Sequence, residues 1–221
     1  GEALTVGPAP LGRVLDEGVG VAHALTVLHA AGTHHADISP GNVLVRADGN
    51  AVLTDLGSLG AKGFGTPGFV APECLRGDGG PAADIFSLAC VLLWRLTGER
   101  LCPDTQALAG LTQRSQIAAR VEASCLKAGL ILPRALRDLL ERMLHPNPRS
   151  RPAAARVLDL LRQVQTWSRS RSSQQLPALT TWWLPARWPF MGPLASAVRR
   201  LGQRLVDDVA RPRLVLVHGP P

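Results

Sequence analysis

The stretch from Ala82 to Thr97 constrains the fold of this chain more than any other. It reads AADIFSLACVLLWRLT and is apolar on almost every side of a helix, and Gly98 follows where helices commonly end. A helix without a polar face has to be covered by other elements, so we expect it to lie buried at the centre of a domain.

Other segments carry the one-sided apolar pattern of helices that pack against such a centre. Val14, Leu15, Ala22 and Leu25 fall mostly on one helical face, which predicts a helix over 13–31. Further helices are expected over about 113–128, 134–144 and 153–165.

Two short strands are expected between the first two helices. The sequence NVLVRADGNAVLTD contains two apolar runs joined by Asp48-Gly49, a strong hairpin signal. The glycine-rich LGSLGAKGFGTPGF that follows lacks periodicity and is expected to be loop. The predicted fold class is mainly α, a helical bundle that carries a small β-hairpin.

Composition excludes several classes of protein. Hydrophobic residues make up 46% of the chain and both charge signs are mixed, which favours a packed core over disorder. The four cysteines show no CxxC pairing, so we expect reduced thiols in a cytoplasmic protein and no cysteine metal site. No apolar run reaches the roughly 18 residues of a membrane span.

Positive charge is concentrated at one end of the chain. Residues 166–221 hold eight Arg and two Asp, which is +6 of the total net charge of +7. We interpret the first part of this region as a solvated Arg/Ser/Trp-rich linker, and no nucleic-acid partner is expected because no nucleic-acid-binding motif accompanies the arginines. Trp182, Trp183 and Trp188 fit either a lipid or partner contact or packing against a neighbouring domain.

A series of short motifs points to chemistry through its order and spacing. The series consists of His35-Ala36-Asp37 with Asn42 five residues on, Asp55-Leu56-Gly57, Ala71-Pro72-Glu73, Asp84 and Arg151. It resembles the C-terminal lobe of a eukaryotic-type protein kinase, including bacterial Ser/Thr kinases, over about Leu11 to Leu161.

The resemblance implies a role for each of these residues. Asp37 would accept or orient the proton of the substrate hydroxyl, with His35 as scaffold of the catalytic loop. Asn42 and Asp55 would bind Mg²⁺ on the phosphates of ATP, and Gly57 belongs to the motif that starts the activation segment. The implied function is transfer of the γ-phosphoryl group of ATP to Ser or Thr of a protein substrate.

Other residues match structural positions of the family. Glu73 and Arg151 correspond to a buried ion pair that ties the activation segment to the lower helices. Asp84 corresponds to a residue that hydrogen-bonds the backbone of the catalytic loop, and Thr66 lies in the loop that receives the substrate residue.

The chain also departs from the family pattern. Ala36 stands in place of an Arg that clamps a phosphorylated activation loop, so regulation by loop phosphorylation is not expected. Ser39 stands where Ser/Thr kinases usually carry a Lys near the transferring phosphate. The alternative to an enzyme is therefore a pseudokinase, a regulatory scaffold module.

No upper-lobe motif precedes Leu11, and GEALTVGPAP resembles the segment after the kinase hinge. We therefore expect residues 1–165 to be a kinase domain whose N-lobe is missing, and the isolated chain to be inactive. Residues 166–188 are predicted to be the linker. Residues 189–221, which end in LVLVHGPP, resemble the start of an AAA or STAND-type P-loop ATPase domain, or form an ordinary terminal strand.

Overall fold

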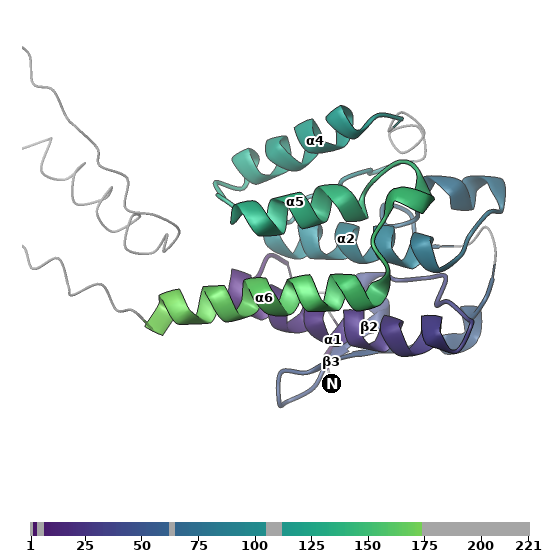
Figure 1. Ribbon diagram of the computed structural model, residues 1–221, viewed down its shortest axis with the longest axis horizontal. Helices are drawn as coiled ribbons and strands as arrows, with labels where there is room; N and C mark the ends of the chain where they lie inside the picture. Colours follow the sequence, from purple (N-terminus) through teal and green to yellow (C-terminus); the bar gives the residue numbers. More distant parts are fainter. Residues whose placement is uncertain (1, 4–6, 62–64, 105–111, 174–221) are drawn as a thin grey trace, which may run out of the picture. The chain divides into compact units, whose positions relative to one another are not determined.

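The computed structural model describes residues 2–3, 7–61, 65–104 and 112–173 (Figure 1). The chain divides into two compact units, Gly1–Thr166 and Trp167–Pro221. All of the catalytic-type motifs fall in the first unit. Residues 189–221, predicted to start an ATPase domain or to form a terminal strand, lie outside the described residues.

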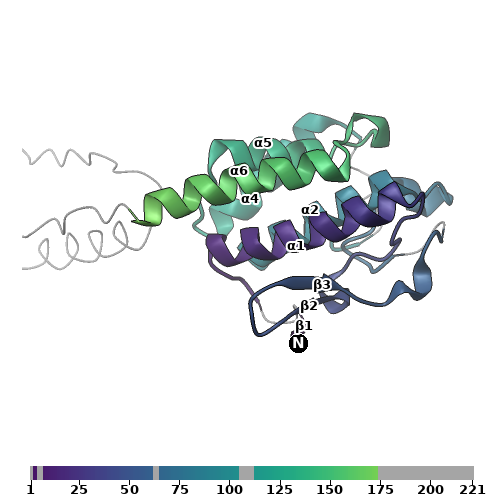
Figure 2. The same cartoon turned by 60° about the horizontal axis from the view of Figure 1, so that its bottom comes forward.

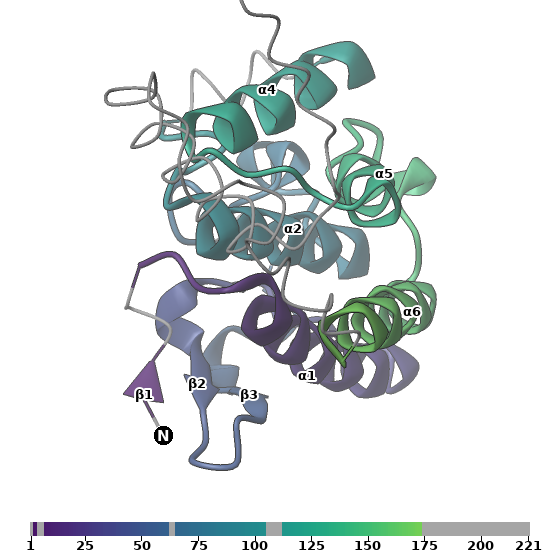
Figure 3. The ribbon, with the colours of Figure 1, turned by 90° about the vertical axis from the view of Figure 1, so that its left-hand side faces the viewer.

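The first unit is a bundle of helices built around α2. Helix α2, Pro81–Thr97, packs against α1, α4 and α5, and Figure 3 shows it between α1 on one side and α4 and α5 on the other. These neighbours span Leu11–Ala30 for α1, Arg114–Lys127 for α4 and Arg134–Met143 for α5. Helix α6, Ala154–Ser173, begins in this unit, and its part up to Thr166 runs alongside α1 (Figure 2).

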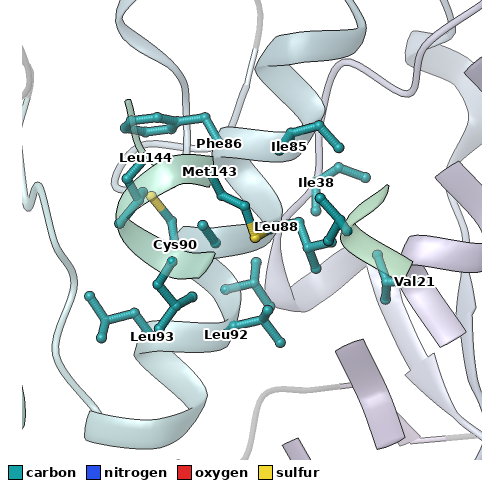
Figure 4. Packing of buried hydrophobic residues seen from close by; sticks show 14 of the residues in the cluster. Val21, Ile38, Ile85, Phe86, Leu88, Cys90, Leu92, Leu93, Met143 and Leu144 are labelled. Carbon is teal, nitrogen blue, oxygen red and sulfur yellow. The ribbon is translucent and has the colours of Figure 1, made fainter. Parts of the chain in front are cut away.

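The prediction of a buried central helix is confirmed. Ile85, Phe86, Leu88 and Leu93 are at most 1% exposed, and they lie among side chains from the surrounding helices (Figure 4). The helix ends at Gly98, whose φ of +78° is the left-handed conformation that glycine adopts without strain.

A small sheet lies beside α1. Strands β2, Val43–Val45, and β3, Ala51–Leu53, form the expected antiparallel hairpin, with Val43 opposite Leu53. The Asp48 carboxylate accepts hydrogen bonds from the backbone and side chain of Asn50 and so closes the turn. A third strand, β1 at Glu2–Ala3, pairs with β2 and was not predicted, because two residues are too few to show a period.

Helix α6 continues further than the sequence pattern indicated. We expected it to end near residue 165 and a polar linker to follow, but the helix extends to Ser173. The change in composition after Gln165 does not stop a helix, because neither glycine nor proline occurs before Pro177 and Arg is a good helix former.

Two further features concern the length of the helices and the state of the cysteines. In the described part of the chain, no helix is both long and apolar enough to span a membrane. All four cysteines are free and buried. Burial raises the pKa of the Cys74 and Cys102 thiols to about 11, and the nearby Glu73 carboxylate adds to the effect at Cys74.

Candidate active site

The Asp37 carboxylate is held from two sides by groups that are distant in sequence. Its Oδ1 accepts hydrogen bonds from the backbone N–H of Thr66, at 2.8 Å, and from the Thr66 hydroxyl, at 2.7 Å. Its Oδ2 accepts a bond of 2.9 Å from Nδ2 of Asn42. Because bonds to an ionised carboxylate are strong, this arrangement fixes the direction in which the carboxylate faces.

Asn42 lies at the end of a short 3₁₀ helix, Pro40–Asn42, directly before β2. Its Nδ2 donates to both the backbone oxygen and the carboxylate of Asp37, each at 2.9 Å. Both partners are acceptors, so the orientation of the amide is determined and Oδ1 points away from Asp37. The Asn42 side chain therefore presents an oxygen that Asp37 does not use.

Asp55 is brought to Asn42 through the neighbouring Thr54. The backbone oxygen of Asn42 accepts hydrogen bonds from the Thr54 backbone N–H, at 2.9 Å, and from the Thr54 hydroxyl, at 3.2 Å. Asp55 itself has left-handed backbone angles, φ 57° and ψ 64°, an arrangement that costs a non-glycine residue about 1 kcal/mol or more. Its exposed carboxylate has no hydrogen-bond or ion-pair partner among the described residues.

Gly57 leaves room beside that carboxylate. A Cβ at this position would lie 3.3 Å from Oδ1 of Asp55, a contact tighter than most side chains tolerate. The glycine thus keeps the surroundings of the Asp55 oxygen open.

His35 links the loop that carries Asp37 to the end of β3. The side chain is fully buried, and its Nε2 lies 2.9 Å from the backbone oxygen of Thr54. Nδ1 accepts a long bond of 3.4 Å from the Asp37 backbone N–H. Because a carbonyl can only accept, Nε2 carries the proton and Nδ1 is the acceptor.

Asp84, in the first turn of α2, accepts hydrogen bonds from the backbone of the same loop. Its Oδ2 accepts bonds from the His35 backbone N–H, at 2.8 Å, and from Nε2 of His29, at 2.9 Å. Its Oδ1 accepts a 3.0 Å bond from the backbone of Ala36, which has a φ of +72°. These contacts hold the unusual backbone of Ala36, and the helix N-terminus favours the negative charge of Asp84.

Glu73 and Arg151 form a second buried cluster next to this loop system. The Glu73 carboxylate accepts hydrogen bonds from both terminal nitrogens of Arg151, which makes a bidentate pair. The Glu73 side chain is 4% exposed and the Arg151 side chain 0%. The guanidinium also donates to the backbone oxygens of Ala82 and His145 and lies 4.9 Å from the Phe86 ring centroid. The pair therefore joins the 3₁₀ helix Pro72–Arg76, the start of α2 and the segment before α6.

The oxygens presented by Asn42 and Asp55 fit a hard divalent cation. An unused amide oxygen and an unpartnered carboxylate, on residues whose backbones are connected through Thr54, are ligand types that Mg²⁺ prefers. Within the described ranges no group of three or more His, Cys, Asp or Glu could hold a metal by itself. This donor set suits Mg²⁺ that is also bound by the phosphates of a nucleotide, which is how proteins usually hold this ion.

The comparison with protein families agrees with the resemblance of the site motifs to a protein kinase. The model of the protein kinase domain matches residues 18–160, which include every site residue described above. The chain belongs to the protein kinase domain family.

Several serine/threonine-protein kinases are similar to this kinase domain. PknK of Mycobacterium tuberculosis is 36% identical over 170 residues, which cover 72% of this chain and 15% of PknK. CBL-interacting serine/threonine-protein kinase 24 of Arabidopsis thaliana is 35% identical over 142 residues, 59% of this chain and 29% of that protein. The chain thus spans only a small part of the length of these relatives.

The structure brings most of the sequence-predicted site residues into one region. Asp37, Asn42, His35, Thr66 and Asp84 are joined by direct hydrogen bonds, with Asp55 and Gly57 reached through Thr54. Glu73 and Arg151 form their own cluster. The catalytic and metal-binding roles of these residues stay predictions.

Two contacts, one partly buried and one buried, escaped the sequence reasoning. Nε2 of His29 lies 2.9 Å from the Asp84 carboxylate. The Glu17 carboxylate on α1 accepts hydrogen bonds from Nε and Nη2 of Arg95 on α2, at 2.9 Å and 2.8 Å. Glu17 and Arg95 are 1% and 3% exposed. The signal was present, because a charged residue within an otherwise apolar helical face needs a partner when buried.

Proposed function

We propose that this kinase domain transfers the γ-phosphoryl group of ATP to serine or threonine hydroxyls of proteins. The observation that carries the proposal is the Asp37 carboxylate, held in one direction by Asn42 and Thr66. A hydroxyl placed against it would be oriented for attack on the γ-phosphorus. The new P–O bond forms as the bond to the leaving ADP oxygen breaks, and the hydroxyl proton passes to Asp37.

Asn42 and Asp55 are the residues that would hold Mg²⁺. The ion, when bound, neutralises charge that develops on the phosphate oxygens. The residues of the chain supply fixed positions: the Asn42 amide is oriented by Asp37, and Asp55 is held beside it by the bonds of Thr54 to Asn42. Preorganised groups of this kind account for most of the catalysis in phosphoryl transfer.

Serine/threonine preference is supported by Thr66 and by the relatives. The names of PknK and of the Arabidopsis kinase state that they are serine/threonine-protein kinases. The Thr66 hydroxyl donates a hydrogen bond to Asp37, so the chain around Thr66 would border the position of a substrate hydroxyl.

We further propose how the chain is organised. Residues 1–165 would be the C-terminal lobe of the kinase domain, completed by an N-terminal lobe that covers the nucleotide. Residues 166–188 would be a linker, which starts in α6, and residues 189–221 would begin an AAA or STAND-type ATPase module. A protein with these parts would act on protein substrates in the bacterial cytoplasm as a signalling enzyme.

One observation favours a second candidate, a regulatory scaffold without kinase activity. Ser39 replaces the family lysine, and within the described part of the chain no basic side chain contacts the Asp37 carboxylate. The intact Asp37, Asn42 and Asp55 favour the enzyme, because a scaffold needs none of these oxygens.

The test is phosphoryl transfer by the complete natural protein with γ-labelled ATP and a mixed protein substrate, followed by phosphoamino-acid analysis. We expect label on serine and threonine, and loss of both labelling and Mg²⁺-dependent nucleotide binding in Asp55→Asn. Asp48→Asn, an exposed change in the β2–β3 turn, is the matched control and should behave like the wild type. Label on tyrosine alone would contradict the assigned specificity, and no label would support the scaffold.

A further inference from the structure

Arg100 lies across the loop that holds Thr66. The guanidinium carbon is 5.7 Å from the centroid of the Phe69 ring, which is a cation–π geometry. The stem of the side chain passes over Gly68, where an added Cβ would lie 2.8 Å from Cδ of Arg100. Gly68 also has a φ of +91°, so glycine suits both the backbone conformation and the close approach.

The surface beneath the guanidinium is rigid. Phe69 is 3% exposed, and its ring meets Trp94 on α2 edge-to-face at a centroid distance of 6.2 Å. The guanidinium of Arg100 therefore lies over an aromatic ring that is packed into the core, while Arg100 itself is exposed to solvent.

Arg100 is not neutralised by a neighbouring acid. Within the described ranges its guanidinium has no carboxylate partner, and it lies over the ring of Phe69. The adjacent Glu99 is paired with Lys127 at 2.7 Å, and Asp104 makes an interaction of its own. The charge is thus available to a ligand that lies along the loop.

The loop that contains Thr66 and Phe69 connects this cation to the Asp37 carboxylate. Thr66 is bonded to Asp37, and Phe69 is three residues further along, a separation that a chain spans in about 10 Å at most. A substrate peptide whose hydroxyl lies against Asp37 and whose chain follows this loop would cover the same distance with about three residues.

We propose that Arg100 is a specificity-determining residue that selects an acidic side chain within about three positions of the phosphorylated Ser or Thr. This inference rests on the proposed kinase function and adds the substrate class, an acidic peptide segment. An aspartate or glutamate there pairs with Arg100 over the Phe69 ring, whereas a lysine at the same place is repelled.

The test measures binding and transfer separately. Fluorescent peptides with one central serine carry Glu, Gln or Lys at the three positions before or after it, and anisotropy gives their Kd for the protein at low salt. We expect the Glu peptide of one of the two sets to bind about three- to five-fold more tightly than its Gln counterpart, as exposed ion pairs do, with the difference lost in 0.5 M NaCl.

Variants assign the effect to Arg100. Arg100→Glu should reverse the preference toward the Lys peptide, and Arg100→Gln, which keeps a long polar stem over Gly68, should abolish it. Arg156→Glu makes the same charge change on the exposed face of α6 and should leave the preference intact. Equal binding of Glu and Gln peptides in both sets, or an unchanged preference in Arg100→Glu, would overturn the proposal.

The same peptides then serve as substrates of the complete protein. If the Glu preference depends on Arg100 but no peptide is phosphorylated, the specificity contact holds and the proposed kinase activity fails. If peptides are phosphorylated without regard to charge, the activity holds and the role of Arg100 fails.

Discussion

Removal of either partner of the buried pair between Glu73 and Arg151 should destabilise the domain more than any surface change. Neither side chain is more than 4% exposed, so each single substitution leaves a charge that water cannot reach. Breaking a buried ion pair in this way costs about 3–5 kcal/mol of unfolding free energy.

The contacts of Arg151 indicate which of the two single variants should lose more unfolding free energy. In Glu73→Ala, the guanidinium keeps the oxygens of Ala82 and His145 and the ring of Phe86, so we expect a loss near 3 kcal/mol. In Arg151→Ala, a buried carboxylate remains and both backbone oxygens lose a donor, so we expect about 5 kcal/mol. The double variant should lose less than the sum of the two, because neither charge is then left alone.

Urea unfolding followed by far-UV circular dichroism measures these losses as shifts of the midpoint at constant slope. Arg134→Ala is the control, because the pair of Arg134 and Asp138 is exposed, 85% and 52%, and its loss should cost about 0.5 kcal/mol or less. Losses below about 1 kcal/mol in both single variants, with an unchanged slope, would refute the reasoning.

Three further predictions concern stability. Gly20→Ala should destabilise by about 1–3 kcal/mol, because the new Cβ would lie 2.7 Å from the backbone oxygen of Ala51, whereas Gly12→Ala, with open space on the same helix, should stabilise slightly; equal urea midpoints would contradict this. Asp84→Asn should cost about 2–3 kcal/mol, since the amide keeps only one acceptor oxygen and the backbone N–H of either His35 or Ala36 would face an NH₂ group, and thermal unfolding should show no comparable loss in exposed Asp138→Asn. Burial raises the pKa of Cys74 and Cys102 from 9.0 to about 11, so the unfolded chain releases these protons first: stability should be constant below about pH 9 and fall from pH 9 to 11. Urea midpoints at pH 8 and pH 10 measure that fall, which should be smaller in the double variant with alanine at both positions; an equal fall there would argue against the thiols as its cause.

Local patterns in the sequence were sufficient for the elements with strong signals. The all-round apolar stretch predicted the central α2, and Asp48-Gly49 predicted the hairpin of β2 and β3, because in both cases the decisive interactions are local. β1 and the last turns of α6 were missed. A two-residue strand exists only through its pairing with β2, and polar residues that favour a linker are equally compatible with a helix.

The site was found through motif order, and its supporting contacts were not. Asp37, Asn42 and Asp55 were singled out by resemblance to a kinase, but nothing in their spacing indicates that Thr66 would bond the Asp37 carboxylate. The contact of Arg100 with Phe69 likewise joins residues that are far apart along the chain. Such long-range contacts depend on how the elements pack, and local periodicity carries no information about them.

The most direct test of the central claim is the phosphoryl-transfer rate of Asp37→Asn in the complete protein. The substitution keeps the size of the side chain and an oxygen for Thr66, but it removes the carboxylate that would take the hydroxyl proton. We predict a fall in kcat of about 10²-fold or more, within the range for loss of general-base catalysis, with little change in the KM for ATP and with Asp48→Asn at the wild-type rate. An Asp37→Asn protein that transfers phosphate at the wild-type rate would contradict the assignment of this site.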